Sequence, residues 1–211
     1  MEIVRQQPLQ NFNTLNIPAS ANYFGVVRQA SDLATLIAMP EYRSASKTVL
    51  GGGSNIVLLN DLPGFVLLNQ IKARMVADET EDYLDLRVGG GENWHELVHY
   101  CVENGWGGIE NLALIPGTAG AAPVQNIGAY GVELKDVLIS VECVELNSGQ
   151  PVSFNNADCE FGYRDSVFKN RYKNRYLISS ILIRLQKKPQ LKLGYGEINQ
   201  QLQQKNISQP T

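Results

Sequence analysis

The chain has 211 residues, of which 44% are hydrophobic, and its formal net charge is −3 with a sequence pI near 5.5. This length and apolar content suit one large or two small domains with a normal core and exclude a disordered chain. The acidic balance provides no basic field for nucleic acid, and no stretch has the apolar length of a signal peptide or a membrane span. We therefore predict a cytoplasmic protein that binds neither nucleic acid nor membranes.

The cysteines and the basic residues add no further class of site. Cys101, Cys143 and Cys159 are odd in number and lack CxxC spacing, so they indicate buried free thiols rather than a disulfide framework or a zinc knuckle. The short basic cluster at 169–175 is interpreted as a solvated loop.

The first unit combines a short helix with two strands around a glycine-rich loop. Ser31 and Asp32 favour a helix that extends to about Met39, and residues 48–50 and 64–69 are predicted to be short buried strands. Between the strands, the stretch VLGGGSNIVL exposes backbone whose N–H groups can converge on an anion. It matches neither the P-loop nor the dinucleotide-binding fingerprint, so a phosphate site and a tight turn between strands both stay open.

The second unit begins near Tyr83. Alternating apolar residues at 84–88 predict a half-buried strand, which runs into a second triple glycine at 89–91 that we interpret as a repeat of the first device. Asn93 is expected to cap a helix that ends at Asn104 and Gly105, with its apolar face formed by Trp94, Leu97, Val98 and Cys101. Strands are predicted at 137–146 and 176–185. We expect two small lobes, residues 1–75 and 76–211.

The segment HELVH within this helix matches the H-E-x-x-H pattern of zinc hydrolases. His95 and His99 stand one helical turn apart, as zinc ligands do, and Glu96 would act as the base. These are the only two histidines in the chain, and no acidic third ligand stands out downstream. The alternative is an exposed helix face.

Two later segments carry further candidate residues. Residues 108–131 are rich in small residues and irregular, which is typical of functional loops, and Gln125 and Asn126 offer polar contacts there. In the segment FGYRDSVFK, Arg164 lies between a tyrosine and an aspartate. It is either a catalytic cation or part of a structural ion pair.

The segments GGGSNIVL, GGGENWHELV, GIENLALIPGTAGAAPVQNIGAYGVEL and FGYRDSVFK, in this order and spacing, resemble the UDP-N-acetylenolpyruvoylglucosamine reductase family of bacterial peptidoglycan precursor synthesis. The resemblance covers nearly the whole chain. It implies an α+β fold, a two-lobed FAD-binding module of the vanillyl-alcohol-oxidase (PCMH) type. It also implies a monomeric enzyme with non-covalent FAD that uses NADPH to reduce UDP-N-acetylglucosamine enolpyruvate to UDP-N-acetylmuramate.

The resemblance further implies roles for particular residues. Arg164 would be the catalytic and substrate-binding cation that stabilises the enolate, and Tyr195 would bind the substrate diphosphate. Residues 51–55 would hold the FAD pyrophosphate. The full set of implied cofactor-binding residues is Gly51, Gly52, Gly53, Ser54, Asn55, Ile56, Pro116, Gly117, Ala121, Ala122, Asn126, Gly128 and Ile178. The family has no metal in this lobe, so the HELVH match is interpreted as coincidence.

The chain departs from the family at its end. Family members continue beyond the position of Thr211 into a third, substrate-binding domain, where the serine of a GSFFKNP motif donates the proton and a later glutamate takes part in catalysis. Neither motif occurs here. We therefore expect a truncated reductase that by itself is a flavin-binding module without the residues that complete the reaction.

Overall fold

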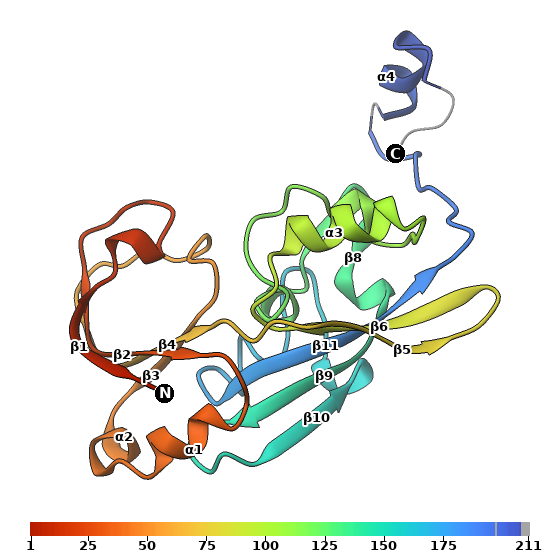
Figure 1. Ribbon diagram of the computed structural model, residues 1–211. Helices are drawn as coiled ribbons and strands as arrows, with labels where there is room; N and C mark the ends of the chain where they lie inside the picture. The colour runs from red at the N-terminus through yellow and green to blue at the C-terminus, as the bar shows by residue number, and fades with distance from the viewer. Residues whose placement is uncertain (197, 208–211) are drawn as a thin grey trace.

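The computed structural model describes residues 1–196 and 198–207, and its two larger β-sheets form two adjacent lobes (Figure 1). The first lobe is built on a four-stranded sheet in the order β1-β2-β4-β3. In it β1 and β2 are antiparallel, whereas β4 runs parallel to both β2 and β3. Its elements are β1 Ile3–Pro8, a 3-10 turn Gln10–Phe12, β2 Ser20–Val27, α1 Asp32–Ile37, α2 Pro40–Ser44, β3 Lys47–Leu50 and β4 Leu62–Asn69.

The second lobe is an antiparallel five-stranded sheet in the order β10-β9-β11-β6-β5, with α3 across one face (Figure 1). Its strands and helices are β5 Arg74–Glu79, β6 Tyr83–Gly89, α3 Trp94–Glu103, β7 Gly128–Ala129, β8 Val132–Glu133, β9 Leu138–Glu145, β10 Pro151–Asn155, β11 Tyr176–Gln186 and α4 Ile198–Gln204. Its 3-10 turns are Glu110–Leu112, Ala122–Gln125, Leu134–Asp136 and Ala157–Cys159.

Helix α3 forms as the sequence predicts. The Asn93 side chain accepts a hydrogen bond from the Glu96 amide at 3.0 Å, and the helix ends before Gly105, whose φ of +73° suits glycine. Its predicted apolar face is fully buried in the main core of the second lobe. Burying each large apolar side chain contributes roughly 1.5–3 kcal/mol relative to exposure, so this face fixes the helix on the sheet.

The five predicted strands are confirmed as β3, β4, β6, β9 and β11, with ends shifted by one or two residues. The helix predicted to reach Met39 ends at Ile37. Met39 precedes Pro40 and has ψ of 126°, because a proline ring disfavours helical backbone in the residue before it. Pro40 then begins α2, which the sequence analysis did not predict.

Six strands and α4 were also missed, and two of these strands are β7 and β8, which have two residues each and pair with each other. β1, β5 and β10 are sheet edges with mostly exposed residues, so their sequences carry no burial pattern of period two. β2 is an interior strand, but its buried positions do not alternate regularly. These elements are strands because of their neighbours in the sheet rather than their own periodicity.

The glycine-rich loop connects two parallel strands. β3 pairs with β4 from Lys47 opposite Phe65 to Leu50 opposite Leu68. Parallel neighbours cannot be joined by a tight hairpin, because the chain must return to the beginning of the next strand. The tight-turn interpretation is therefore wrong, and residues 51–61 form a crossover at the end of the sheet.

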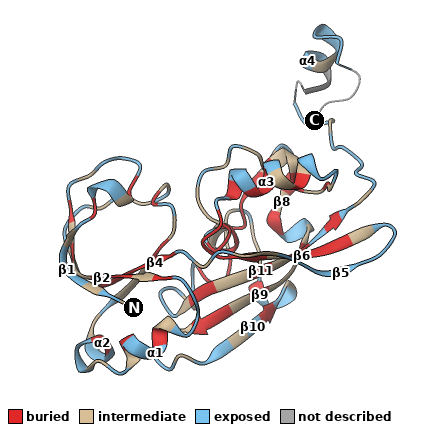
Figure 2. Ribbon diagram, viewed as in Figure 1, coloured by how far each residue is buried: buried red, intermediate tan, exposed pale blue. Residues whose placement is uncertain are grey.

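The two lobes share apolar contacts. Leu146 and Leu177 of the second lobe belong to the same buried cluster as Leu33, Tyr42 and Phe65 of the first. Figure 2 shows buried residues along the central strands of both lobes and on the inner face of α3. The two sheets separate between the end of β4 at Asn69 and the start of β5 at Arg74. The division into residues 1–75 and 76–211 stays a prediction.

The cysteines are buried with free thiols, as predicted. Burial raises the pKa of Cys101 and of Cys159 to about 12, so neither thiol ionises near neutral pH. The basic side chains at 169–175 are exposed, as expected for a solvated loop. Within residues 1–196 and 198–207, no helix is both long and apolar enough to cross a membrane.

Candidate cofactor-binding site

Directly after β3, residues 51–55 present a run of free backbone N–H groups. Within the described part of the chain, none of these five amides donates a hydrogen bond to a protein acceptor. Of the three glycines only Gly53 has a left-handed φ, +65°, and its carbonyl accepts a hydrogen bond from the Thr14 amide at 3.1 Å. The loop is thus anchored to the first lobe while its donors stay available, as in backbone anion sites.

A loop of the second lobe faces this segment across a cavity of about 190 Å³. A Cβ atom placed on Gly52 would lie only 3.3 Å from the Cα atom of Gly117, so the two backbones approach closely. Ten of the predicted cofactor-binding residues line this cavity: Gly51, Gly52, Gly53, Ser54, Asn55, Ile56, Pro116, Gly117, Ala121 and Ala122. The structure therefore brings the two predicted loops together, and their contact with a cofactor stays a prediction.

A smaller cavity of about 100 Å³ adjoins the first and shares Gly51, Thr118 and Ala121 with it. Ile178 of β11 lines this cavity beside Asn69, whose Nδ2 donates to the Ile178 carbonyl at 2.8 Å. The predicted Ile178 thus lies in the same cleft. The sequence analysis missed Asn69 and Thr118, because nothing in their sequence neighbourhood marks them as facing a cavity.

One side-chain contact bridges the two loops. Asn55 donates from Nδ2 to Oε1 of Gln125 at 2.7 Å. The cavities are smaller than the roughly 300–1,000 Å³ that is typical of ligand pockets.

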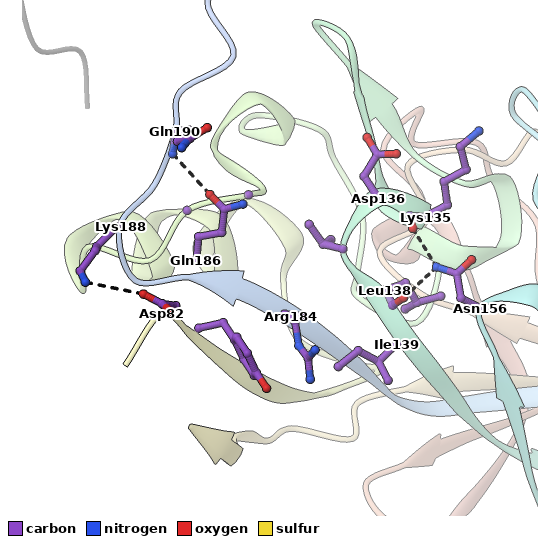
Figure 3. A pocket seen from close by; sticks show the side chains of 14 residues that line it. Asp82, Lys135, Asp136, Leu138, Ile139, Asn156, Arg184, Gln186, Lys188 and Gln190 are labelled. Carbon is purple, nitrogen blue, oxygen red and sulfur yellow. Dashed lines mark hydrogen bonds and ion pairs between the residues drawn. The ribbon is translucent and has the colours of Figure 1, made fainter. Parts of the chain in front are cut away.

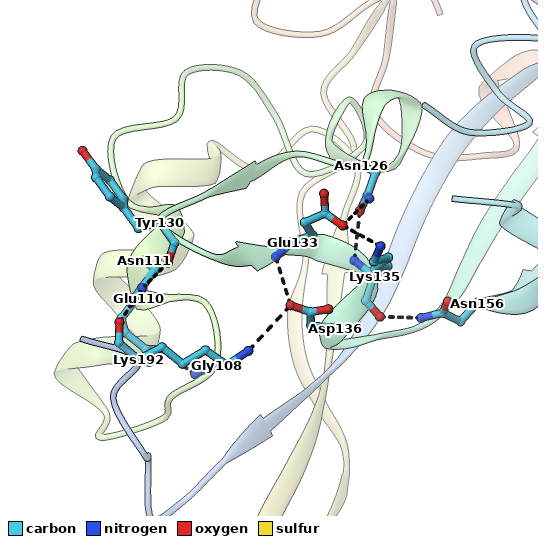
Figure 4. Close-up of polar contacts among 10 residues, drawn as sticks. All are labelled: Gly108, Glu110, Asn111, Asn126, Tyr130, Glu133, Lys135, Asp136, Asn156 and Lys192. Atoms are coloured by element: carbon cyan, nitrogen blue, oxygen red, sulfur yellow. Dashed lines mark hydrogen bonds and ion pairs between the residues drawn. The ribbon is translucent and has the colours of Figure 1, made fainter. Parts of the chain in front are cut away.

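The side chain of Asn126 is held by hydrogen bonds to other parts of the protein (Figure 4). It is fully buried, its φ is +42°, and its Nδ2 donates to the Gly162 carbonyl at 3.0 Å and to the Glu133 carboxylate at 3.2 Å, while Oδ1 accepts from the Lys135 amide. Neither it nor Gly128 lines the two cavities. The geometry favours a positioning role for Asn126 rather than the direct cofactor contact we predicted, because its amide is already used within the protein.

Glu133 completes this network. The hydrogen bond from Lys135 at 2.7 Å, with smaller contributions from Asn126 and Arg164, holds the pKa of the Glu133 carboxyl below its ordinary value. The network therefore ties the end of the small-residue loop to the turn that carries Arg164.

Arg164 is fixed by backbone carbonyls. Its guanidinium donates to the carbonyl oxygens of Gly128 and Asn126 and lies 5.4 Å from the ring centre of Tyr163. Asp165, its sequence neighbour, instead accepts from Asn170. Within the described residues Arg164 has no carboxylate partner at ion-pair distance, so the structural ion-pair interpretation gains no support there. Its φ of +54° is unusual for a residue with a side chain.

Tyr195 lies away from the glycine loop. It is 57% exposed, and its ring packs edge-to-face against Tyr130 with centres 6.1 Å apart. The two tyrosines line an open cavity of about 420 Å³ beside Leu202 of α4. The structure brings Tyr195 to the same end of the second lobe as the irregular loop, and its contact with substrate stays a prediction.

The second triple glycine, residues 89–91, does not form a loop with free backbone amides as residues 51–53 do. The amides of Gly89, Gly90 and Gly91 donate to the carbonyls of Ala73, Ser179 and Ile71 at 2.7–2.9 Å. A Cβ atom at any of them would lie within 2.6 Å of other atoms, most of them backbone. These glycines allow backbone segments to pack against each other, so our interpretation of a repeated ligand loop is wrong.

The two histidines of HELVH contact different partners within the protein. His95 accepts a hydrogen bond on Nδ1 from the Leu114 amide at 3.2 Å, and His99 pairs with Glu103 at 3.2 Å on the exposed side of α3. Among the described residues, no group of three or more His, Cys, Asp or Glu side chains could hold a metal ion. His95 instead anchors the chain just before Pro116.

A larger cavity, about 750 Å³, lies apart from the glycine loop (Figure 3). Its charged side chains are already paired: Lys188 lies 3.6 Å from Asp82, and Arg184 stacks on Tyr83 and binds both oxygens of Asp85. This pairing explains why Asp85 is buried where the sequence pattern predicted an exposed polar residue. Because its charges are paired within the protein, we assign no ligand to this cavity.

Comparison with known proteins identifies the class of this site. Residues 22–155 match the FAD binding domain family, so the chain belongs to this family of FAD-binding proteins. The solved structure of 6-hydroxy-D-nicotine oxidase from Arthrobacter nicotinovorans has the same fold, with a TM-score of 0.62 at 16% identity over 88% of this chain and 42% of that chain. The predicted fold class and FAD as the cofactor are confirmed.

Within that class, the chain is similar to UDP-N-acetylenolpyruvoylglucosamine reductases. It is 44% identical to that of Chromobacterium violaceum, over 96% of this chain and 60% of the relative, and 39% identical to that of Flavobacterium johnsoniae, over 100% and 62%. The solved reductase of Thermus caldophilus matches with a TM-score of 0.67 at 25% identity, over 100% of this chain and 70% of that chain. The predicted resemblance is confirmed, and the chain spans about 60% of the length of these curated relatives.

Proposed function

We propose that this chain forms the FAD-binding part of an NADPH-dependent UDP-N-acetylenolpyruvoylglucosamine reductase. The observation that carries the proposal is the run of free amides at 51–55, which faces a loop of small residues across the interlobe cavity. Phosphate oxygens accept hydrogen bonds and carry negative charge, so they complement such a run of donors. The FAD pyrophosphate would bind there.

The rest of the cleft fits the remainder of this cofactor. Gly117, Ala121 and Ala122 let the backbone approach a flat ring, and Ile178 provides an apolar wall in the adjoining cavity. When bound, FAD supplies the hydride-transfer chemistry. The protein's own contribution is to hold, orient and shield it.

Arg164 is the group we assign to the reaction itself. Reduction of the enolpyruvyl double bond places negative charge next to the substrate carboxylate, and a fixed cation stabilises that charge as it develops. The guanidinium stays protonated, and the carbonyls of Gly128 and Asn126 hold it in one orientation. Tyr195, exposed beside Tyr130, would bind the diphosphate of the UDP-sugar.

The complete reaction belongs to the whole protein. The relatives' names supply the proposed substrate, the UDP-sugar UDP-N-acetylenolpyruvoylglucosamine, and the chain matches only about 60% of their length. We therefore propose that residues 1–211 alone bind flavin without turnover. Location in the cytoplasm and a monomeric state remain part of the proposal.

Titration of the purified chain with FAD, followed by flavin fluorescence and visible absorption, tests the proposal. We expect fluorescence quenching and a shifted flavin spectrum at micromolar protein. If a chain shown to be folded by circular dichroism causes neither change, the assignment of the 51–55 loop to FAD is wrong.

A further inference from the structure

Two side-chain hydroxyls in the described part of the chain are buried without a hydrogen-bond partner. They belong to Tyr42 in α2 and to Thr118 in the loop of the second lobe. A buried polar group without a partner is unfavourable by roughly 1–3 kcal/mol, so each requires an explanation. Their surroundings differ, and the difference points to a function for only one of them.

The Tyr42 hydroxyl lies in a closed apolar core. Its ring packs edge-to-face on Phe65 at 5.0 Å in the cluster that contains Leu33 and Leu36. Burial raises its pKa well above the ordinary value for tyrosine. Tyr42 lines none of the cavities described above. Its hydroxyl therefore lacks a partner because the ring is packed in the core, and we assign it no ligand.

The Thr118 hydroxyl lies in the wall between the two cavities of the candidate site and lines both. A Cβ atom built on Gly51 would be 2.6 Å from Thr118 Oγ1, so this hydroxyl is adjacent to the first of the free amides. It comes from the second lobe, whereas the amides come from the first.

The backbone on both sides of Thr118 is fixed. The Gly117 carbonyl accepts from the Trp94 amide at 3.1 Å, and the Ala119 amide donates to the Glu92 carbonyl at 2.9 Å. These bonds attach the loop to the start of α3. The hydroxyl is therefore held at the cavity wall rather than swinging freely in solvent.

We propose that Thr118 is a cofactor-binding residue whose hydroxyl donates to a phosphate oxygen of the dinucleotide held on the 51–55 amides. The inference rests on the proposed function and adds the second lobe's own donor to the phosphate site. Binding would supply the acceptor that the hydroxyl lacks in the free protein. The phosphate would then join the two lobes, with amides on one side and Thr118 on the other.

The experiment uses three variants: Thr118→Val, Thr118→Ser and, as a matched control, Tyr42→Phe. A hydrogen bond to a charged acceptor accounts for roughly tenfold to a hundredfold in affinity, so Thr118→Val should raise the FAD dissociation constant by about that factor. Thr118→Ser keeps the hydroxyl and should retain affinity within about threefold. Tyr42→Phe should leave FAD affinity unchanged.

Melting temperatures without FAD separate binding from folding. Thr118→Val and Tyr42→Phe each remove a buried hydroxyl without a partner, so both should melt at or above the wild-type temperature. Only Thr118→Val should combine an unimpaired free protein with weaker FAD binding. The bound flavin should keep its wild-type absorption maxima in this variant, because the lost contact is to phosphate.

Four results would overturn the inference. These are wild-type FAD affinity in Thr118→Val, loss of affinity in Thr118→Ser equal to that in Thr118→Val, a lower melting temperature for free Thr118→Val, and shifted maxima, which would place the contact on the flavin ring. Absence of FAD binding by the folded wild type would instead contradict the proposed function.

Discussion

The two triple glycines of this chain have the same composition and opposite uses. At 89–91 all three amides donate to protein carbonyls, whereas at 51–53 none does in the described structure. The 51–53 segment therefore keeps its donors for a ligand, whereas the 89–91 segment uses them to pack backbone segments of the protein against one another. The comparison shows that the unsatisfied N–H group, rather than the glycine, is the mark of a backbone binding site.

The largest effect is expected from a substitution in the 89–91 segment. Gly90→Ala would place its Cβ atom 2.2 Å from the Ile178 carbonyl oxygen, in backbone that cannot move without opening the sheet. We expect a loss of roughly 3 kcal/mol or more in the free energy of unfolding, measured by urea denaturation. Gly194→Ala is the control, because no atom lies within 4 Å of its Cβ position and its φ is not in the left-handed region. Equal stability of Gly90→Ala and wild type would contradict this packing role.

A second prediction concerns the role of Arg164 in the reaction rather than in FAD binding. In the full-length protein, Arg164→Lys should reduce turnover by about two orders of magnitude, as for loss of one donor that stabilises developing charge. The lysine keeps the charge but cannot reproduce the planar guanidinium. FAD binding should be retained.

Stopped-flow measurement of the two half-reactions identifies the cause. Oxidation of NADPH by the flavin should be little changed in Arg164→Lys, because that step places no charge on the sugar substrate. If both half-reactions slow equally, Arg164 supports the flavin site and its assigned catalytic role is wrong.

Gly52→Val tests whether the 51–53 segment contributes to FAD binding. The Cβ atom of the valine would lie 3.3 Å from Gly117 Cα, so the branched side chain would occupy the space between the loops. We expect FAD affinity to fall by about tenfold or more, with little loss of stability, because φ at Gly52 is not in the left-handed region. Fluorescence titration and thermal unfolding measure the two effects. Unchanged affinity would mean that Gly52 serves only the crossover.

The smallest expected effect concerns the network that holds the second loop. Because the pKa of Glu133 is lowered on folding, its stabilising contribution is present above the unfolded value of about 4.5 and is lost as the pH falls through the folded value. Glu133→Gln should therefore be less stable than wild type by about 0.5–1 kcal/mol at pH 7. This difference should shrink in urea denaturation as the pH falls below 4.5 and through the lowered folded-state pKa of Glu133. A difference independent of pH would contradict the assigned charge interaction.

Elements with strong local signals were predictable. The cap at Asn93, the apolar face of α3 and the buried strands β4, β9 and β11 follow from residue types and their periodicity. The edge strands β1, β5 and β10 were missed, because exposure on a sheet edge leaves no such pattern. Ten of the predicted cofactor-site residues line one cavity, and only the family resemblance grouped them, since no local rule joins residues 51–56 to 116–122.

The sequence by itself determined the composition of each loop: glycines without side chains at 51–53 and 89–91, small residues at 117–122, and a single arginine in FGYRDSVFK. Only the tertiary structure decided which of these groups were satisfied. Pairing of β11 with β6 places Ser179 at the Gly90 amide, while the parallel crossover after β3 brings no acceptor to the amides at 51–55. Hydrogen-bond satisfaction depends on partners distant in sequence, and for that reason one of two identical tripeptides became a backbone packing contact and the other a candidate phosphate site.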